Sequence, residues 1–197
     1  MNALEMRSKP DLLTPPAISS IIGFLMNAFK VGDRIIYPNQ GLGIIEGIQD
    51  QAFDGEKFLI YCLRIKANNT LVMVPASSAE EMGIRKLISE RSVKEIFDFM
   101  KNGVIEVTMN WKGRYKEHIN LMKSGTLFDM VAVLKSLYYL SLLKPLSFRE
   151  KKMMEKAKEL IISEISAASS LPIPQIERKI TLTLSSCFKD VKPGLEA

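Results

Sequence analysis

The apolar residues of this chain change their spacing once along the sequence, and that change limits the folds open to it. Between residues 29 and 75, short apolar runs rich in β-branched side chains are separated by turn signals such as Asn68–Asn69. From residue 110 to 168, apolar residues recur every three or four positions, the spacing of an α-helix. This order predicts the α+β class, with a small bent β-sheet or barrel followed by a compact all-helical domain.

Helix starts in the second half are marked by capping residues. Asn110, Thr126 and Ser147 each stand before a periodic apolar run, and Glu150 completes a capping box with Ser147. These caps predict three amphipathic helices, over roughly 111–123, from Thr126 to Pro145, and from Ser147 to about Ala168. Such helices, joined by short loops, pack as a bundle.

The chain is predicted to have four segments. They are an N-terminal extension (1–28), the sheet domain (29–101), the helical domain (102–168) and a poorly ordered C-terminal tail (169–197). The first domain ends with a helix opened by a capping box at Ser92 and Glu95, and residues 102–109 form the linker. In the tail, Pro172 and Pro174 interrupt regular structure, and residues 180–184 alternate as a strand would.

The basic charge lies mainly in the second half. Residues 29–100 contain nine Lys and Arg against ten Asp and Glu, whereas residues 101–168 contain twelve against seven. The formal net charge of the chain is +5. A nucleic-acid surface is therefore expected in the helical domain.

Motifs for catalysis, metal binding or membrane insertion are missing from the sequence. Gly41–Leu42–Gly43 lacks the third glycine of a dinucleotide loop, and a lone His118 does not build a zinc site. Cys62 and Cys187 are too few and too distant for a disulfide framework, which fits a reducing cytoplasm. We predict a protein that is not an enzyme, needs no cofactor or metal, and does not span a membrane.

Trp111, the only tryptophan, begins the first predicted helix of the bundle beside Lys112, Arg114 and Lys116. A single tryptophan usually packs in a core. A tryptophan surrounded by cations can instead insert between nucleic-acid bases while the cations contact phosphates. The residues alone leave both interpretations open.

Lys151, Lys152 and Lys156 open the last predicted helix. Such lysines are either a solvated face or a phosphate-binding edge, where they give salt-dependent affinity without sequence preference.

Two sets of motifs together resemble the CarD/CdnL family of bacterial transcription regulators. Residues 29–33 (FKVGD), Tyr37–Pro38, Gly41–Leu42–Gly43 and 72–75 (VMVP) are similar to the RNA-polymerase-interacting domain shared with transcription-repair coupling factors. Asn110–Trp111, residues 114–116 (RYK), Ser124–Gly125 and Leu146–Ser147 are similar to the helical C-terminal domain of CarD proteins. The resemblance covers residues 29 to about 168.

On the DNA side, the resemblance implies that the helical domain contacts promoter DNA at the upstream edge of the melted region. The family's minor-groove wedge falls by position on Trp111. Arg114, Lys116 and Lys151 match basic positions near that DNA.

On the polymerase side, the resemblance implies a Tudor-like first domain that binds the RNA polymerase β subunit by strand-to-strand pairing. Gln51, Leu71 and Met73 fall on the polymerase-binding surface, and Gln51 and Met73 stand where well-known members carry arginine. Asn39–Gln40 replaces the usual histidine after Tyr-Pro.

These observations predict a monomeric, cytoplasmic and nucleoid-associated transcription regulator that stabilises the open promoter complex. The alternative is an architectural DNA-binding protein without polymerase contact, favoured by the charge distribution and the replaced arginines. A third hypothesis is a protein-interaction module with Trp111 in its core.

Overall fold

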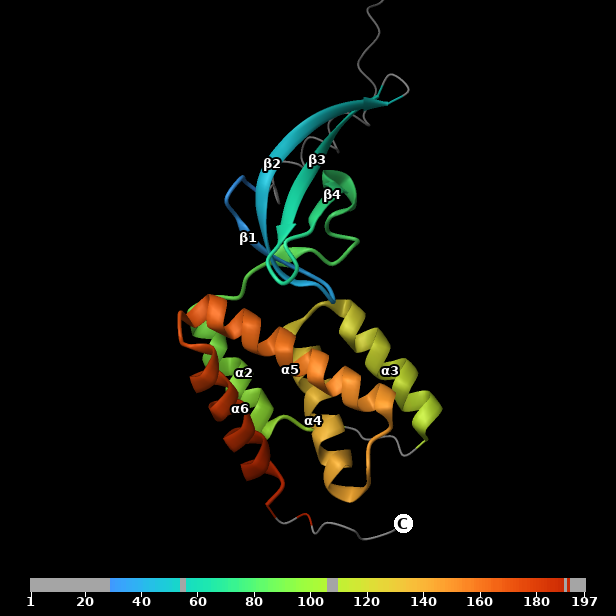
Figure 1. Ribbon diagram of the computed structural model, residues 1–197, viewed down its shortest axis with the longest axis vertical. Coiled ribbons are helices and arrows are strands. Elements are labelled where there is room, and N and C mark those ends of the chain that lie inside the picture. The colour runs from blue at the N-terminus through green and yellow to red at the C-terminus, as the bar shows by residue number, and fades with distance from the viewer. Residues whose placement is uncertain (1–28, 54–55, 106–109, 190, 192–197) are drawn as a thin grey trace, which may run out of the picture.

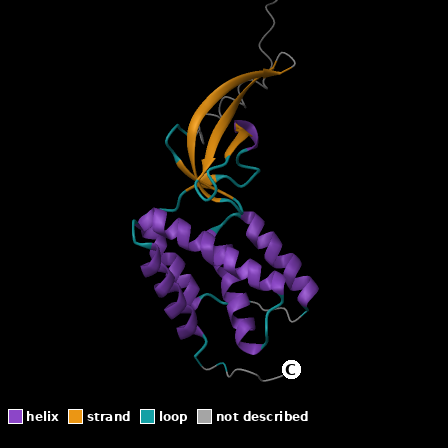
Figure 2. Ribbon diagram, viewed as in Figure 1, coloured by secondary structure: helices purple, strands orange, loops and turns teal. Residues whose placement is uncertain are grey.

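The computed structural model describes residues 29–53, 56–105, 110–189 and 191, and it places a β-sheet at one end of a helical bundle (Figures 1 and 2). The strands are β1 (Arg34–Tyr37), β2 (Gly41–Phe53), β3 (Glu56–Ile65), β4 (Leu71–Pro75) and β5 (Arg85–Lys86), with a 3-10 helix η1 (Ala76–Ser78) after β4. The helices are α2 (Glu90–Asn102), α3 (Trp111–Ser124), α4 (Leu127–Leu143), α5 (Phe148–Ser169) and α6 (Ile173–Cys187). The predicted α+β class is confirmed.

The sheet has the strand order β4-β3-β2-β1-β5, and every neighbouring pair is antiparallel. β2 and β3 are much longer than their neighbours. β1 pairs with β2 only as far as Ile44, and β4 pairs with β3 only from Ile60, so the far part of the β2–β3 hairpin extends beyond both outer strands. The register shifts between Ile45 and Gly47. An extra residue of this kind bends a strand, and the long hairpin curves visibly in Figure 1. The predicted bend of the sheet is present.

The predicted caps of the three central helices are confirmed. The side chain of Asn110 accepts a hydrogen bond from the Lys112 amide, and that of Thr126 accepts one from the Asp129 amide. Ser147 forms both halves of the capping box at the start of α5. Because each cap is made within four residues, its position could be predicted from the sequence.

Helix α2 differs from the prediction in its start and in its packing. Ser89 is the N-cap and accepts a 3.2 Å hydrogen bond from the amide of Ser92, so the predicted capping box was three residues late. Its buried residues join the core of the helical bundle: Val93, Ile96, Phe97 and Met100. The predicted boundary at residue 101 assigned this helix to the sheet domain, whereas its apolar face packs with the other helices.

The predicted poorly ordered tail is corrected by helix α6. Pro172 is the N-cap and Pro174 lies in the first turn, where a missing N–H breaks no hydrogen bond. Ile176, Ile180 and Leu184 are four residues apart and are buried in the helical core. Both prolines therefore start a helix instead of preventing one, and the strand-like alternation was misleading. The extension 1–28, linker residues 106–109, and residues 190 and 192–197 of the tail lie outside the described residues.

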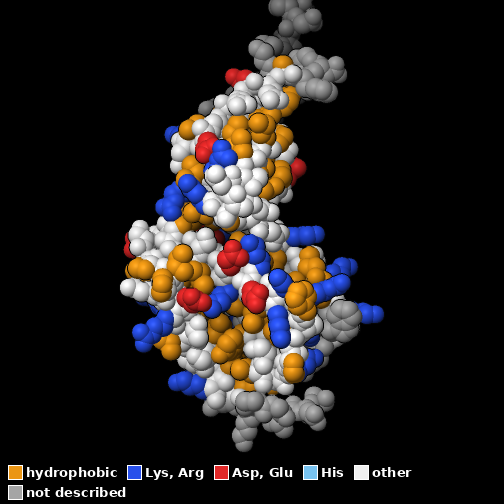
Figure 3. All heavy atoms as spheres, viewed as in Figure 1, with side chains coloured by type: hydrophobic (Ala, Val, Ile, Leu, Met, Phe, Trp, Pro, Cys, Tyr) orange, Lys and Arg blue, Asp and Glu red, His pale blue; other side chains and the backbone are white. Residues whose placement is uncertain are grey.

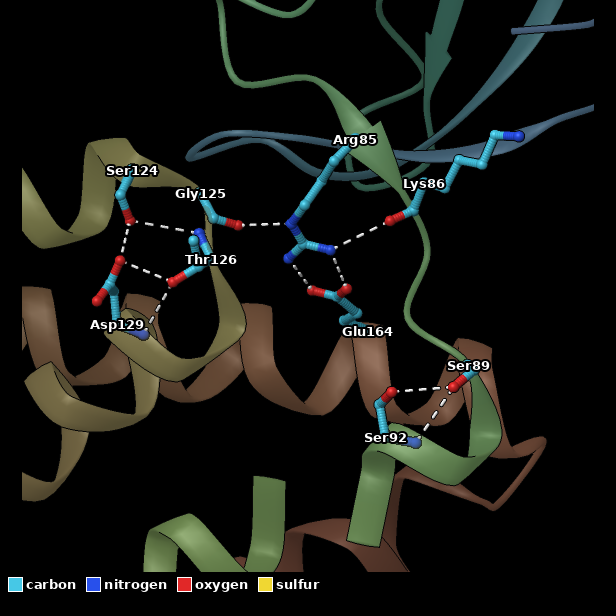
Figure 4. Close-up of polar contacts among 9 residues, drawn as sticks. All are labelled: Arg85, Lys86, Ser89, Ser92, Ser124, Gly125, Thr126, Asp129 and Glu164. Carbon is cyan, nitrogen blue, oxygen red and sulfur yellow. Dashed lines mark hydrogen bonds and ion pairs between the residues drawn. The ribbon is translucent and has the colours of Figure 1, made fainter. Parts of the chain in front are cut away.

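An ion pair joins the sheet to the bundle (Figure 4). Arg85 of β5 binds the carboxylate of Glu164 of α5 with both terminal nitrogens, at 2.5 and 2.8 Å, and its Nε donates to the Gly125 carbonyl at 2.8 Å. Glu164 is only 2% exposed, so loss of Arg85 would leave a buried carboxylate without an ion-pair partner.

Close contact at the same junction requires two glycines. The backbone φ angles of Gly83 and Gly125 are 74° and 75°, which other L-residues rarely adopt. A Cβ atom on either would lie 2.9 or 3.0 Å from the ring of Pro38. The β1–β2 turn thus lies directly against the α3–α4 turn, and the two parts of the molecule are held in one orientation.

Candidate nucleic-acid interface

A second ion pair joins the first turns of α3 and α5. Arg114 donates from Nη2 to Glu150 Oε1 at 2.6 Å. Glu150 also accepts hydrogen bonds from the amide and the hydroxyl of Ser147, at 3.0 and 2.8 Å. The guanidinium group and its partner carboxylate are 2% and 13% exposed. This buried network fixes the start of α5 beside the start of α3.

The Glu150 carboxylate remains ionised in this network. Burial alone would raise its pKa, but the hydrogen bonds from Arg114 and Ser147 outweigh burial and lower the pKa to about 2. The negative charge of Glu150 is thus directed toward Arg114 and away from solvent.

This placement bears on the prediction that Arg114 contacts DNA. A guanidinium that is 2% exposed and bound to a carboxylate cannot reach a phosphate without breaking a buried ion pair. Arg114 instead positions the two helix starts that carry the exposed cations.

The predicted cations Lys116 and Lys151 are both exposed, on α3 and α5. Arg149 and Lys152 of α5 are exposed beside Lys151. Figure 3 shows Lys and Arg side chains over the helical half of the molecule, several of them near α3. Trp111 is the first residue of α3, one helical turn before Tyr115, and its side chain lies outside the described structure. The helix starts therefore present a basic surface next to Trp111.

A groove between α3 and α5 was missed by the sequence reasoning. It has a volume of about 400 Å³ and is lined by Asn39, Tyr115, Ile119, Met122, Lys123, Phe148, Arg149, Lys152, Met153 and Lys156. Phe148 is 74% exposed, and Lys152 Nζ lies 5.5 Å from its ring centroid. An aromatic residue directly after the Ser147 cap and before several cations was the signal that would have identified it.

On the sheet, Gln51, Leu71 and Met73 lie on one face. Their partners in β3 are Phe58, Arg64 and Cys62, and alternate residues of a strand share a face. Leu71 and Met73 are 42% and 55% exposed. β4 ends the strand order of the described sheet, so its outer edge has no strand beside it there. Two of the predicted polymerase-binding residues, Leu71 and Met73, thus lie on the edge strand β4, while Gln51 shares their face two strands away, on β2.

His118 lies inside the bundle, 4% exposed, with Nε2 3.2 Å from the hydroxyl of Ser136. Burial lowers its pKa to about 4, and the charge of Arg114 contributes in the same direction. His118 is therefore a neutral packing residue at neutral pH.

Neither a metal site nor a membrane span is found in the described ranges. No three His, Cys, Asp or Glu side chains there are grouped closely enough to hold a metal ion. None of the described helices is both long and apolar enough to cross a membrane.

Both the sheet part and the helical part of the chain match models of known protein families. Residues 29–88 match the family model "CarD-like/TRCF RID domain", and residues 95–181 match "CarD, C-terminal domain". A Bacillus subtilis (strain 168) protein named "Putative transcription factor YdeB" is 33% identical over 149 residues, which cover 76% of this chain and 97% of that protein. The chain belongs to the CarD/CdnL family.

The second CarD match begins within α2 and ends within α6, in agreement with the packing of both helices in the helical core. Among solved structures, the solution NMR structure of the 72-residue N-terminal domain of Myxococcus xanthus CarD is 34% identical. The matched region covers 29% of this chain and 77% of the Myxococcus xanthus structure, with a TM-score of 0.26.

Proposed function

We propose that this CarD-family chain is a transcription regulator that binds the RNA polymerase β subunit with its sheet and upstream promoter DNA with its helical domain. Holding both partners at once stabilises the open promoter complex. One observation carries the proposal: Arg85 and Glu164 join a sheet with an exposed edge strand to a basic helical domain in a fixed orientation. Both partners are cytoplasmic, so we place the protein in the cytoplasm.

The polymerase contact is proposed at β4. An edge strand offers unpaired backbone N–H and C=O groups to a strand of a partner, and such pairing supplies much of the affinity. Leu71 and Met73 add exposed apolar area on the adjacent face, with Gln51 further along it. Backbone pairing of this kind does not depend on the arginines that Gln51 and Met73 replace.

The DNA contact is proposed at the starts of α3 and α5. Lys116 and Lys151 are exposed there and would contact phosphates, which positions the chain without reading sequence. Trp111 would act as a wedge that binds distorted, opened DNA more tightly than closed duplex. Binding one state more tightly shifts the population toward that state.

The polymerase contact is tested by a pull-down of the full chain with the isolated β-subunit lobe of its own RNA polymerase. Met73→Glu places a charge on the exposed face of β4 and is expected to abolish specific binding. Met82→Glu is the matched control, because Met82 is 40% exposed and lies outside β4. Binding that survives Met73→Glu would contradict the proposed surface.

The wedge is tested separately by the lifetime of the open promoter complex. Trp111→Ala is expected to shorten that lifetime while leaving the polymerase pull-down unchanged. An unchanged lifetime would refute the wedge role.

A second candidate function is an architectural DNA-binding protein that acts without polymerase. The replaced arginines and the basic helical domain favour it. Binding of the chain to duplex DNA at physiological salt, together with a failed β-lobe pull-down, would support this function over the first. A strict requirement for polymerase would exclude it.

A further inference from the structure

We propose that the groove between α3 and α5 binds a single strand of nucleic acid, with a base stacked on Phe148 and phosphates on the surrounding cations. Lys116 and Lys151, the proposed duplex contacts, are not among the described residues that line this groove. This proposal rests on the proposed function in one respect: a melted promoter would supply the single strand. Binding itself requires no polymerase.

The charge of the groove favours an anionic ligand. Among the described residues that line it, four are cations, Lys123, Arg149, Lys152 and Lys156, and none is Asp or Glu. The Glu150 carboxylate is bound by Arg114 and Ser147, so it does little to offset these cations. Glu159 offsets Lys156 in part, through a 3.4 Å ion pair on the surface. The remaining lining cations leave a net positive groove.

The aromatic residues favour a ligand with flat rings. Phe148 is 74% exposed at the first position of α5, so the helical core does not require it. Tyr115 lines the same groove, with the Arg149 guanidinium carbon 6.0 Å from its ring centroid. Exposed aromatic rings among cations are the combination by which proteins hold single strands, since the rings stack on bases and the cations bind phosphates.

The shape and the chemistry favour a single strand over a duplex or an acidic peptide. A groove of about 400 Å³ has the size of a small-ligand site, which suits an unstacked base and its sugar-phosphate. Bases within a duplex cover one another, so a protein ring stacks only on a base that has left the helix. An acidic peptide would use the cations but would leave Phe148 without a stacking partner.

The groove is preorganised by the network at the helix starts. Arg114 and Glu150 hold the first turns of α3 and α5 together, and Asn39 from the β1–β2 turn closes one side of the lining. Because these parts need no rearrangement, little ordering cost opposes binding.

The decisive experiment measures binding of the full chain to a fluorescent oligothymidylate by anisotropy, without polymerase. Phe148→Ala is expected to raise the dissociation constant by about tenfold, the usual order for the loss of one stacked base. Phe128→Ala is the control, since Phe128 is 43% exposed on α4 and lies outside the groove lining. Equal affinities of the two variants would overturn the proposal, as would failure of the unmodified chain to bind at low salt.

The salt dependence gives a readout that a purely structural role would not change. Lys152→Gln is expected to reduce the slope of log K against log salt by about 0.7, the value for one phosphate of a single strand. Lys94→Gln, at an exposed lysine of α2 outside the groove, is expected to leave the slope unchanged. An unchanged slope in Lys152→Gln would overturn the proposed phosphate contact.

A labelled polyglutamate identifies the ligand class in the same assay. Tighter binding of polyglutamate than of the oligothymidylate would reassign the groove to acidic protein segments and overturn the proposal. Because polymerase is absent, a failed pull-down in the β-lobe experiment does not affect this result. Conversely, loss of strand binding leaves the proposed polymerase contact intact.

Discussion

The two halves of this molecule present different chemistry to their surroundings. The sheet half, residues 29–88, is balanced in charge, with seven Lys and Arg against seven Asp and Glu, and exposes apolar side chains such as Leu71 and Met73. The helical half, residues 89–189, has seventeen Lys and Arg against eleven Asp and Glu. The exposed apolar face and edge strand of the sheet favour strand pairing with a protein, whereas the positive charge of the bundle favours binding of an anionic polymer.

The two halves also differ in how they are stabilised. The sheet buries one small cluster: Phe29, Ile35, Ile45, Tyr61, Leu63, Val74, Ala79 and Ile84. The helical core draws buried residues from all five described α-helices. A small core is marginal by itself, so the sheet is expected to depend on its junction with the bundle.

The largest expected effect comes from breaking that junction. Arg85→Ala leaves the 2% exposed Glu164 carboxylate without its partner, which is expected to cost about 3–5 kcal/mol in the free energy of unfolding. Urea unfolding of the full chain measures this loss and shows whether the two halves then unfold in separate transitions.

Arg64→Ala is the matched control for the junction variant. It removes an ion pair to Glu46 whose partners are 27% and 45% exposed, and such surface pairs contribute about 0–1 kcal/mol. Equal losses in the two variants would show that the halves do not depend on the Arg85–Glu164 pair.

A smaller loss in the free energy of unfolding is expected from a cavity in α6, which tests whether this helix stabilises the helical core. Ile180 is fully buried in the helical core, so Ile180→Ala is expected to cost about 3 kcal/mol through lost burial and a residual cavity. Leu182→Ala, at a residue that is 60% exposed, is expected to stay within about 0.5 kcal/mol of the unmodified chain. Denaturant midpoints of both variants measure the difference. Similar midpoints would mean that α6 does not stabilise the bundle.

The smallest of the three effects is a pH dependence that belongs to the helical half, because His118 is the only histidine in the chain. Its pKa is about 4 in the folded chain against an ordinary 6.5. Between these values the unfolded chain binds a proton that the folded chain does not. Stability is therefore full above about pH 6.5 and decreases as the pH falls toward 4.

The measurement is the free energy of unfolding from pH 7 to about 4.5, a range in which protonation of Glu150 contributes only near the lower end. We expect a loss of about 2 kcal/mol attributable to His118 over this range. His118→Gln, which removes the titrating group, is expected to flatten this part of the curve. The same slope in both proteins would assign the pH dependence to other groups.

Much of the fold could be predicted because its signals are local. The caps at Asn110, Thr126 and Ser147 are made within four residues, so they can be recognised in the sequence. The start of α2 was placed three residues late because Ser92 and Glu95 imitate a capping box, while Ser89 makes the actual cap. The buried residues of α6 have helical spacing, but Pro172 and Pro174 also favour an irregular segment, and the sequence does not show that they stand at a helix start.

The candidate site was predicted less completely. Lys116 and Lys151 are exposed as expected, and Gln51, Leu71 and Met73 lie on one face. Arg114 is predicted as a DNA contact from its position in the family motif, which does not show that its side chain is buried against Glu150. The groove residue Phe148 was missed because an apolar residue after a cap looks like part of a core.

The sequence by itself determined the order of the two halves, the bend in the sheet, the starts of three helices and the side of the molecule that carries the positive charge. These properties follow from spacing and from hydrogen bonds between near neighbours. Only the tertiary structure decided which charges face water. Arg85 and Arg114 form ion pairs with Glu164 and Glu150, which lie 79 and 36 residues further along the chain. A buried charge needs such a partner, and a partner that distant in sequence is identified only by the fold.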